Sequence, residues 1–260
     1  MNSNTESTRP KNQIDILGVP VNSLTLSAVL DIVDDAIRVK RNLHIGVVNA
    51  AKVVNMRKDP ELRTAVLESD LILADGIAVV WASKILGRPL PERVTGIDLM
   101  FGMFQRGNDK AYRVYCLGAT EEVSRQVAEK LKRDYPNVVL AGRRNGYFSE
   151  AEEEEVAKNI GAAKPDILLV AMTSPKKERF MAKWNSVMNV TVVHGVGGSF
   201  DVMAGKIERA PKMWQKLGLE WLYRVKQEPG RLWRRYLITN WQFCWLTLKA
   251  LIARLVGVGN

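Results

Sequence analysis

Residues 195–236 read GVGGSFDVMAGKIERAPKMWQKLGLEWLYRVKQEPGRLWRRY, and this stretch joins two parts of the chain that differ in character. It begins with a glycine-rich turn, residues 195–201, that ends in an acidic residue, Asp201. It continues as a run of Arg, Lys and Trp residues that leaves the α/β pattern behind. A turn of the first kind is typical of sites for phosphorylated small molecules, and a run of the second kind suits anionic lipid. We therefore expect a ligand site directly beside a lipid-binding surface.

The basic charge of the chain is concentrated in its C-terminal part. The 260 residues carry a formal net charge of +10, and residues 206–260 alone contain eleven Lys or Arg and three Glu, a net charge of +8. The composition is otherwise that of a globular protein large enough to bury a proper core. We expect a disordered leader at residues 1–13 and an α/β body at 14–205, which could divide into sub-lobes 14–110 and 111–205. A basic, Trp-rich helical appendage is expected at 206–260.

Strands that alternate with helices predict the fold of the body. Apolar runs predict strands at 14–19, 44–48, 71–73, 112–117, 138–141, 167–172 and 190–193, and amphipathic or capped segments predict helices at 23–39, 59–69, 77–86, 95–104, 121–134, 149–163 and 174–187. This alternation indicates an α/β fold with a Rossmann-like, mainly parallel sheet and helices on both faces. In the tail we expect one helix at 214–226, a break at Pro229-Gly230 and a last helix at 231–256.

Candidate ligand-binding residues follow several of the predicted strands. Open parallel sheets bind ligands at the carboxyl ends of their strands, where this chain has Asn49, Asp75-Gly76, Gly118-Ala119-Thr120 and the turn 195–201. A glycine before a helix start offers backbone N–H groups to a phosphate. Each turn alone is more simply a tight link between strand and helix, but their convergence on one edge favours a phosphate or nucleotide site. A dehydrogenase-type dinucleotide site is poorly supported because no complete G-x-G-x-x-G is present.

Asp75 is the sharpest candidate for catalysis. It follows an apolar strand and precedes Gly76, so its carboxylate could take a proton from an attacking hydroxyl. The alternative, which the pattern alone slightly favours, is that Asp75 caps the helix that follows. Residues 173–178 follow another strand and either present a hydroxyl, a cation and a carboxylate to a ligand or form only a capped helix start. His44 and His194 are isolated, which favours packing roles, and no motif indicates a metal site.

The basic tail could contact nucleic acid or a membrane surface. Arg224, Arg231, Arg234 and Arg235 are interleaved with Trp, a side chain that suits the lipid interface. An apolar stripe at three- and four-residue spacing consists of Leu237, Trp241, Cys244, Trp245, Leu248, Leu251, Ile252 and Leu255. This stripe predicts a helix that lies in the interface without spanning it. Nucleic acid would explain the Arg residues but not the stripe, and a packed pair of C-terminal helices is the plain alternative.

The chain also contains an ordered series of short motifs. They are Asp75-Gly76, residues 93–98, Leu117-Gly118, Ser174-Pro175-Lys176 with Glu178, residues 195–198 with Phe200-Asp201, Ala204-Gly205, Arg209-Ala210-Pro211, and residues 218–224 with Glu228-Pro229 and Arg231. Over roughly residues 14–236 this series resembles the WecG/TagA/CpsF family of bacterial glycosyltransferases. Members of that family transfer a sugar from a UDP donor to a polyprenyl-diphosphate-linked saccharide on the cytoplasmic membrane face. They include N-acetylmannosaminyltransferases.

The resemblance implies roles for individual residues. Asp75 would be the general base of an inverting, metal-independent displacement, and Asn49 and Arg93 would line the same pocket. Further substrate-binding positions are Gly118, Ser174, Lys177, Glu178, Gly195, Gly197, Gly198 and Asp201, and the lipid diphosphate and the membrane would meet Arg209, Arg224, Arg231 and Arg234. The chain has Val47, Thr173 and Lys177 where many members have Thr, Gly and Gln. Because these positions are expected near the donor sugar or its diphosphate, the resemblance does not identify the sugar.

The function that the resemblance implies is sugar transfer without a cofactor or metal ion. The donor would be a UDP-sugar of N-acetylmannosamine or hexose type, the acceptor would be polyprenyl-diphosphate-linked, and the product would enter cell-surface polysaccharide. We expect no nucleic-acid partner, and a homo-oligomer is left open. We expect the chain in the cytoplasm, bound peripherally to the inner face of the membrane, because no stretch is apolar enough to span it. The alternative is a non-catalytic nucleotide- or nucleic-acid-binding protein with a basic tail.

Overall fold

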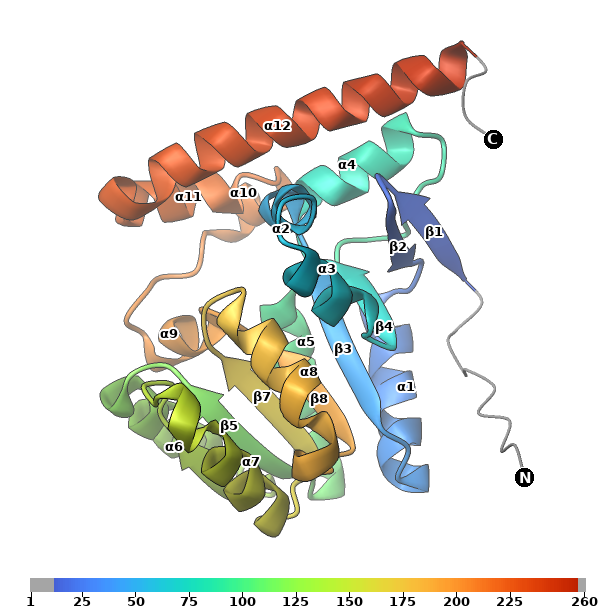
Figure 1. Cartoon of the computed structure of the whole chain (residues 1–260). Coiled ribbons are helices and arrows are strands. Elements are labelled where there is room, and N and C mark those ends of the chain that lie inside the picture. Colours follow the sequence, from blue (N-terminus) through green and yellow to red (C-terminus); the bar gives the residue numbers. More distant parts are fainter. Residues whose placement is uncertain (1–11, 257–260) are drawn as a thin grey trace, which may run out of the picture.

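A six-stranded sheet forms the centre of the computed structural model, which describes residues 12–256 apart from the side chains of Lys216 and Arg231 (Figure 1). Most of the predicted leader therefore lies outside the described residues. The strands are, in spatial order, β4 (Leu71–Ala74), β3 (Leu43–Val48), β8 (Val192–Gly195), β7 (Ile167–Ala171), β5 (Arg113–Gly118) and β6 (Val139–Arg144). Every neighbouring pair is parallel. The predicted α/β fold with a mainly parallel sheet is confirmed.

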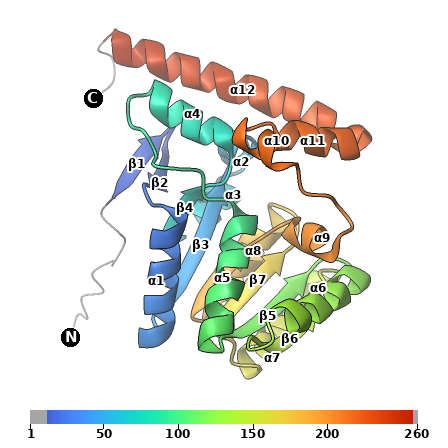
Figure 2. The same cartoon turned by 180° about the vertical axis from the view of Figure 1, so that it is seen from behind.

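Helices cover both faces of this sheet (Figures 1 and 2). One face packs against α1 (Leu26–Val39), α5 (Gly96–Lys110), α6 (Glu121–Asp134) and the short α9 (Ser199–Ala204). The other face packs against α7 (Glu153–Ala162) and α8 (Lys176–Met188), with α3 (Pro60–Leu67) beside α8. The predicted capping box of Ser149 and Glu152 is confirmed at the 3-10 turn η1 (Glu150–Glu152), which leads into α7. Since each central strand is covered on both sides, nearly all of its apolar side chains are buried.

A β-hairpin precedes the first helix, where a single strand at residues 14–19 was expected. β1 (Gln13–Ile16) and β2 (Val19–Asn22) are antiparallel, and the turn between them consists of Leu17 and Gly18, both with positive φ. Two residues in this conformation make a tight hairpin turn whose twist matches that of the strands. The Gly18 N–H also donates to Asp15 Oδ1. The single-strand prediction is wrong because the turn lies inside an apolar run, where Leu17 gives no turn signal.

Helices α2 (Ala50–Met56) and α4 (Ile77–Ile85) follow β3 and β4 at one end of the sheet. Together with the hairpin they enclose a separate cluster of buried side chains. Helix α2 was not expected, because seven residues are too few for a clear helical period. Asn49 is its N-cap, and its Oδ1 accepts the Lys52 N–H at 3.0 Å. A predicted site residue is thus held in place by the helix that it caps.

The C-terminal part contains α10 (Lys212–Lys216), α11 (Glu220–Gln227) and α12 (Pro229–Leu255). The single helix expected at residues 214–226 is wrong, because Gly218 with a φ of +71° separates α10 from α11. The break expected at Pro229-Gly230 lies one residue earlier, at Glu228, which separates α11 from α12. Pro229 is the first residue of α12, a position where proline lacks only an N–H that has no partner in the helix anyway.

Helix α12 runs along α2 and α4 (Figure 1) and has two apolar faces. The inner face packs on α2 and α4 through Phe243, which is 3% exposed, and through Leu246 and Ala250. The Arg254 guanidinium adds a hydrogen bond to Leu86 O at the end of α4. The outer face consists of exposed members of the predicted stripe: Leu237, Trp241, Cys244, Trp245, Leu248, Ile252 and Leu255. No helix within residues 12–256 is both long and apolar enough to cross a membrane.

Candidate active site

A large cleft opens between the carboxyl ends of the strands and the C-terminal helices. Its volume is about 1310 Å³, which exceeds the roughly 300–1,000 Å³ typical of a site for one small ligand. One wall comes from segments that follow β3, β4, β7 and β8, and the other from α11 and α12. The predicted site residues in these walls are Asn49, Asp75, Arg93, Ser174, Lys177, Gly195, Gly197, Gly198, Asp201 and Arg224. The cleft is large enough to hold two substrates side by side.

Asp75 lies at the end of β4, with one of its carboxylate oxygens already engaged. The Gly96 N–H, the first of helix α5, donates to Asp75 Oδ1 at 3.0 Å. Helix α4 begins after Gly76 and has no side-chain cap, so the interpretation of Asp75 as the cap of α4 is wrong. Asp75 Oδ2 makes no hydrogen bond with the described residues, which leaves it to accept one from a ligand. The carboxylate is therefore oriented by one oxygen and able to react through the other.

Arg93 reaches the cleft from the loop between α4 and α5. The next residue, Val94, donates its N–H at 3.0 Å to the carbonyl oxygen of Ala74, the residue that precedes Asp75 in the sequence. The Arg93 guanidinium forms an ion pair with Glu220 of α11 at 3.0 Å, and both side chains are largely buried. Arg93 and Asp75 thus line the same cleft.

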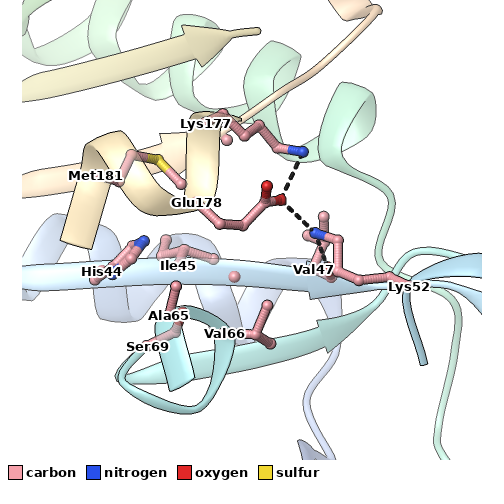
Figure 3. Close-up of a pocket in the computed structure, with 12 residues that line it drawn as sticks. His44, Ile45, Val47, Lys52, Ala65, Val66, Ser69, Lys177, Glu178 and Met181 are labelled. Carbon is pink, nitrogen blue, oxygen red and sulfur yellow. Dashed lines mark hydrogen bonds and ion pairs between the residues drawn. The ribbon is translucent and has the colours of Figure 1, made fainter. Parts of the chain in front are cut away.

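Two lysines of the cleft wall share one carboxylate in a small pocket behind that wall (Figure 3). Lys52 Nζ lies 2.8 Å and Lys177 Nζ 2.7 Å from Glu178 Oε1, and all three side chains are less than a tenth exposed. Lys52 Nζ also donates to Val47 O at 2.7 Å. Both lysines line the cleft, whereas Glu178 lies behind its wall. The cluster thus contributes a net positive charge where an anionic ligand could bind.

The burial of this cluster changes its titration. Burial lowers the pKa of Lys177 to about 8, and the neighbouring charge of Lys52 lowers it as well. Burial alone would raise the pKa of Glu178, but the two ammonium groups bring it down to about 2. Glu178 is therefore ionised throughout the physiological range, while Lys177 loses its proton only slightly above it.

The two histidines lie behind the cleft and do not line it. His194 Nδ1 and Nε2 lie 3.2 Å and 3.4 Å from the carbonyl oxygens of Ile45 and Gly96. Burial lowers the pKa of both rings, that of His44 to about 4, so both are neutral at pH 7. These contacts agree with the packing roles expected from the sequence. The described residues contain no group of three or more His, Cys, Asp and Glu side chains that could hold a metal ion.

The glycine turn after β8 uses several of its N–H groups within the protein. Val196 and Gly197 both donate to Val170 O, and Ser199 donates to Val196 O. These three N–H groups are not available to a phosphate. The Lys177 side chain, which lies against Gly195, is therefore the stronger candidate to hold a diphosphate in this part of the cleft.

The turn after β5 is a tight link between strand and helix. Gly118 has a φ of +124°, and a side chain at this position would collide with Ala171 O. The Ala119 N–H donates to that same oxygen, and α6 then begins with Glu121 and Glu122. Two carboxylates at the start of a helix disfavour an anion there, so this turn is less suited to phosphate than the sequence indicated.

Some predicted site residues lie outside the cleft walls. Gly118 and Glu178 lie behind them, Arg209 forms an ion pair with Asp98 of α5, and Arg234 is exposed on α12. The side chain of Arg231 is outside the described residues. Conversely, the walls contain aromatic and charged residues that were not predicted to line the site: Tyr147, Glu220, Trp221 and Tyr236. Tyr147 follows the Asn145-Gly146 pair after a strand, which is a turn signal that could have pointed to it.

Comparison with known proteins gives two findings. The model of the family described as "Glycosyl transferase WecG/TagA/CpsF family" matches residues 14–256. An N-acetylglucosaminyldiphosphoundecaprenol N-acetyl-beta-D-mannosaminyltransferase of Bacillus spizizenii is 35% identical over 233 residues, which are 88% of this chain and 87% of that protein. The family match includes the α/β body and the C-terminal helices.

Proposed function

This chain belongs to the glycosyl transferase WecG/TagA/CpsF family, and from that premise we propose that it moves a sugar from a UDP donor to a polyprenyl-diphosphate-linked saccharide. The donor sugar is of N-acetylmannosamine or hexose type. The observation that carries the proposal is the oriented carboxylate of Asp75, which lines the same cleft as the cation of Lys177. One group can activate an acceptor hydroxyl and the other can attract a diphosphate. A nucleic-acid-binding protein has no need of this pairing.

The reaction is a single displacement with inversion at the sugar. Asp75 Oδ2 takes the proton of the acceptor hydroxyl as its oxygen attacks the anomeric carbon of the donor. The bond from that carbon to the diphosphate oxygen breaks, and UDP leaves with the bonding electron pair. Negative charge increases on the diphosphate as this bond lengthens, so a nearby cation lowers the barrier. Lys177, supported by Lys52, is that cation.

The lipid end of the acceptor enters from the side of α11 and α12. Arg224 and Arg235 line the cleft on these helices, and an Arg guanidinium can pair with a phosphate in a bidentate fork. The outer face of α12 lies against the membrane surface, with exposed Arg234 and Lys249 close to it in sequence. The protein is thus a peripheral membrane protein on the inner face of the membrane. Its exposed Trp side chains lie in the lipid interface.

The proposal is tested by measuring UDP release from a panel of UDP-sugars with a short-chain polyprenyl-diphosphate-linked acceptor. We expect one donor, of N-acetylmannosamine or hexose type, to give UDP release that requires the acceptor. Release that is independent of the acceptor, or absent for every donor, would contradict the proposal. RNA and DNA binding are measured in parallel, since the alternative function requires one of them.

The affinity for UDP is expected to fall as the pH rises through the pKa of Lys177. This pKa is lowered to about 8, so the ammonium group is present at pH 7 and mostly lost at pH 9. If the diphosphate binds the charged form, the Kd for UDP should be about tenfold higher at pH 9 than at pH 7. Calorimetry at both pH values measures this difference. The Lys177→Gln variant has no group to titrate, so persistence of the same pH dependence in it would refute the assignment.

A further inference from the structure

The ion pair between Arg93 and Glu220 joins parts of the chain that are far apart in sequence. The two residues are separated by 127 positions, and Arg93 Nη1 donates to Glu220 Oε2 at 3.0 Å. The side chains are only 16% and 13% exposed, and both line the cleft. A pair that is largely removed from water attracts more strongly than a surface pair and is costly to break on one side only. This contact therefore differs from the exposed ion pairs elsewhere on the molecule.

The backbone around Arg93 is fixed on both sides, whereas its side chain depends on Glu220. The Glu92 carboxylate accepts the Leu26 N–H at the start of α1, and the Val94 N–H is bound to Ala74 O. The guanidinium stands at the end of a long side chain with many rotamers. Glu220 is the one acceptor that the described residues offer to it. It is this carboxylate that holds the guanidinium at one place in the cleft.

Glu220 is itself placed by the contacts of the segment that precedes it. A Cβ on Gly218 would come within 2.8 Å of the Ile77 side chain, so the chain passes in close contact with the start of α4. Farther back, Arg209 pairs with Asp98 in the first turn of α5. The segment 209–220 thus contacts α4 and α5, and the starts of these two helices frame Asp75. The position of the C-terminal helices therefore affects the geometry around Asp75.

We propose that Glu220 is a positioning residue for sugar transfer: it fixes the Arg93 guanidinium in the cleft only when α11 is docked. Arg93 has further N–H donors besides the one that Glu220 engages, and these are directed to the diphosphate of the acceptor. The inference rests on the proposed function. It adds that the C-terminal helices, besides facing the membrane, complete the active site through a carboxylate.

The test compares Glu220→Gln with the wild type in the acceptor-dependent UDP-release assay. Glutamine keeps the size of the side chain but lacks the charge, so the guanidinium is held less firmly. A misplacement of about 1 Å costs about 100-fold in rate, and we expect kcat to fall about 10- to 100-fold while the Kd for UDP stays at the wild-type value. Glu220→Asp, which restores the charge on a shorter side chain, should recover part of the loss.

A double-mutant cycle distinguishes positioning from general damage to the fold. If Glu220 acts through Arg93, the variant Arg93→Gln/Glu220→Gln should be no slower than Arg93→Gln alone, because the second change has nothing left to disturb. Losses that multiply would overturn the proposal. Tyr223→Phe is the matched control, since it removes a hydrogen bond from α11 to Glu208 without touching Arg93. It should keep the wild-type kcat.

The outcomes separate this proposal from the proposed function. If the wild type releases UDP on adding acceptor but Glu220→Gln keeps its kcat, only the positioning role is wrong. If the wild type transfers no sugar from any donor, the proposed function fails, and the positioning role fails with it. Melting temperatures measured for every variant show whether a loss of rate comes from unfolding, and Glu220→Asp keeps the test valid if Glu220→Gln is unstable.

Discussion

Replacing Asp75 by Asn is expected to lower the rate of sugar transfer by about 10²- to 10⁴-fold, the range typical of losing a general base. The amide oxygen of Asn can still accept the Gly96 N–H that now binds Asp75 Oδ1. The fold and the connection between β4 and α5 should therefore survive. The amide nitrogen that takes the place of Oδ2 cannot accept a proton, so the acceptor hydroxyl is no longer activated. Acceptor-dependent UDP release measures the loss.

Two further measurements make this result specific to catalysis. The Kd for UDP should stay at the wild-type value in Asp75→Asn, since the carboxylate is assigned to the acceptor hydroxyl and the diphosphate to Lys177. Asp34→Asn is the matched control. Asp34 is another partly buried carboxylate, paired with Arg106 and Lys110 far from the cleft, so its loss should cost stability but not rate. Full turnover by Asp75→Asn would exclude Asp75 as the base.

The parallel sheet could be predicted because its signals are local. The central strands are largely apolar, and several helices start after a residue whose side chain caps them. Thr95 and Thr120 accept N–H bonds as N-caps of α5 and α6. The hairpin turn and helix α2 were not predicted because their local signals are weak. The turn has Leu17 at its first position, which is not a typical turn residue, and α2 is too short to show a helical period.

The contacts that make the site could not be predicted, because they join distant residues. Asp75 was recognised from its place after a strand, but its partner is the backbone of Gly96, which only the packing of α5 brings there. Lys52 was not singled out, since nothing near residue 52 indicates that its ammonium group meets Glu178, 126 positions away. The same holds for Glu220, whose role depends on where α11 docks.

The apolar stripe in the sequence predicted the exposed face of helix α12 but not the face that packs on the protein. The inner face contains Thr239 and Thr247, which read as polar positions in the sequence. Their hydroxyls donate to the carbonyl oxygens of Arg235 and Phe243 one turn earlier, so both side chains are buried without an unsatisfied polar group. The helix therefore buries a face whose sequence mixes polar and apolar residues, and it exposes the face whose sequence is apolar. An exposed apolar stripe of this kind on a docked helix is typical of a surface that contacts another molecule.

Replacing Trp241 and Trp245 by Glu is expected to abolish binding to vesicles that contain anionic lipid. The two rings are 73% and 50% exposed on the outer face of α12, so their loss should leave the fold intact. Burying an aromatic side chain of this size contributes about 1.5–3 kcal/mol, and the two together correspond to about a hundredfold or more in partitioning. Co-sedimentation with vesicles measures the binding. Transfer to a long-chain, membrane-embedded acceptor should fall with it.

The double Glu variant tests membrane attachment more cleanly than removal of residues 206–260. Deletion would uncover the cluster into which Phe243 packs and would remove Glu220 and Arg224 from the cleft, so lost activity would have several causes. With Trp241→Glu/Trp245→Glu these contacts remain, and transfer to a short-chain, water-soluble acceptor should continue at nearly the wild-type rate. Val39→Glu/Val187→Glu is the control, because it places the same added charge at exposed apolar positions on α1 and α8. If that control loses vesicle binding to the same degree, net charge attaches the protein, and the outer face of α12 does not.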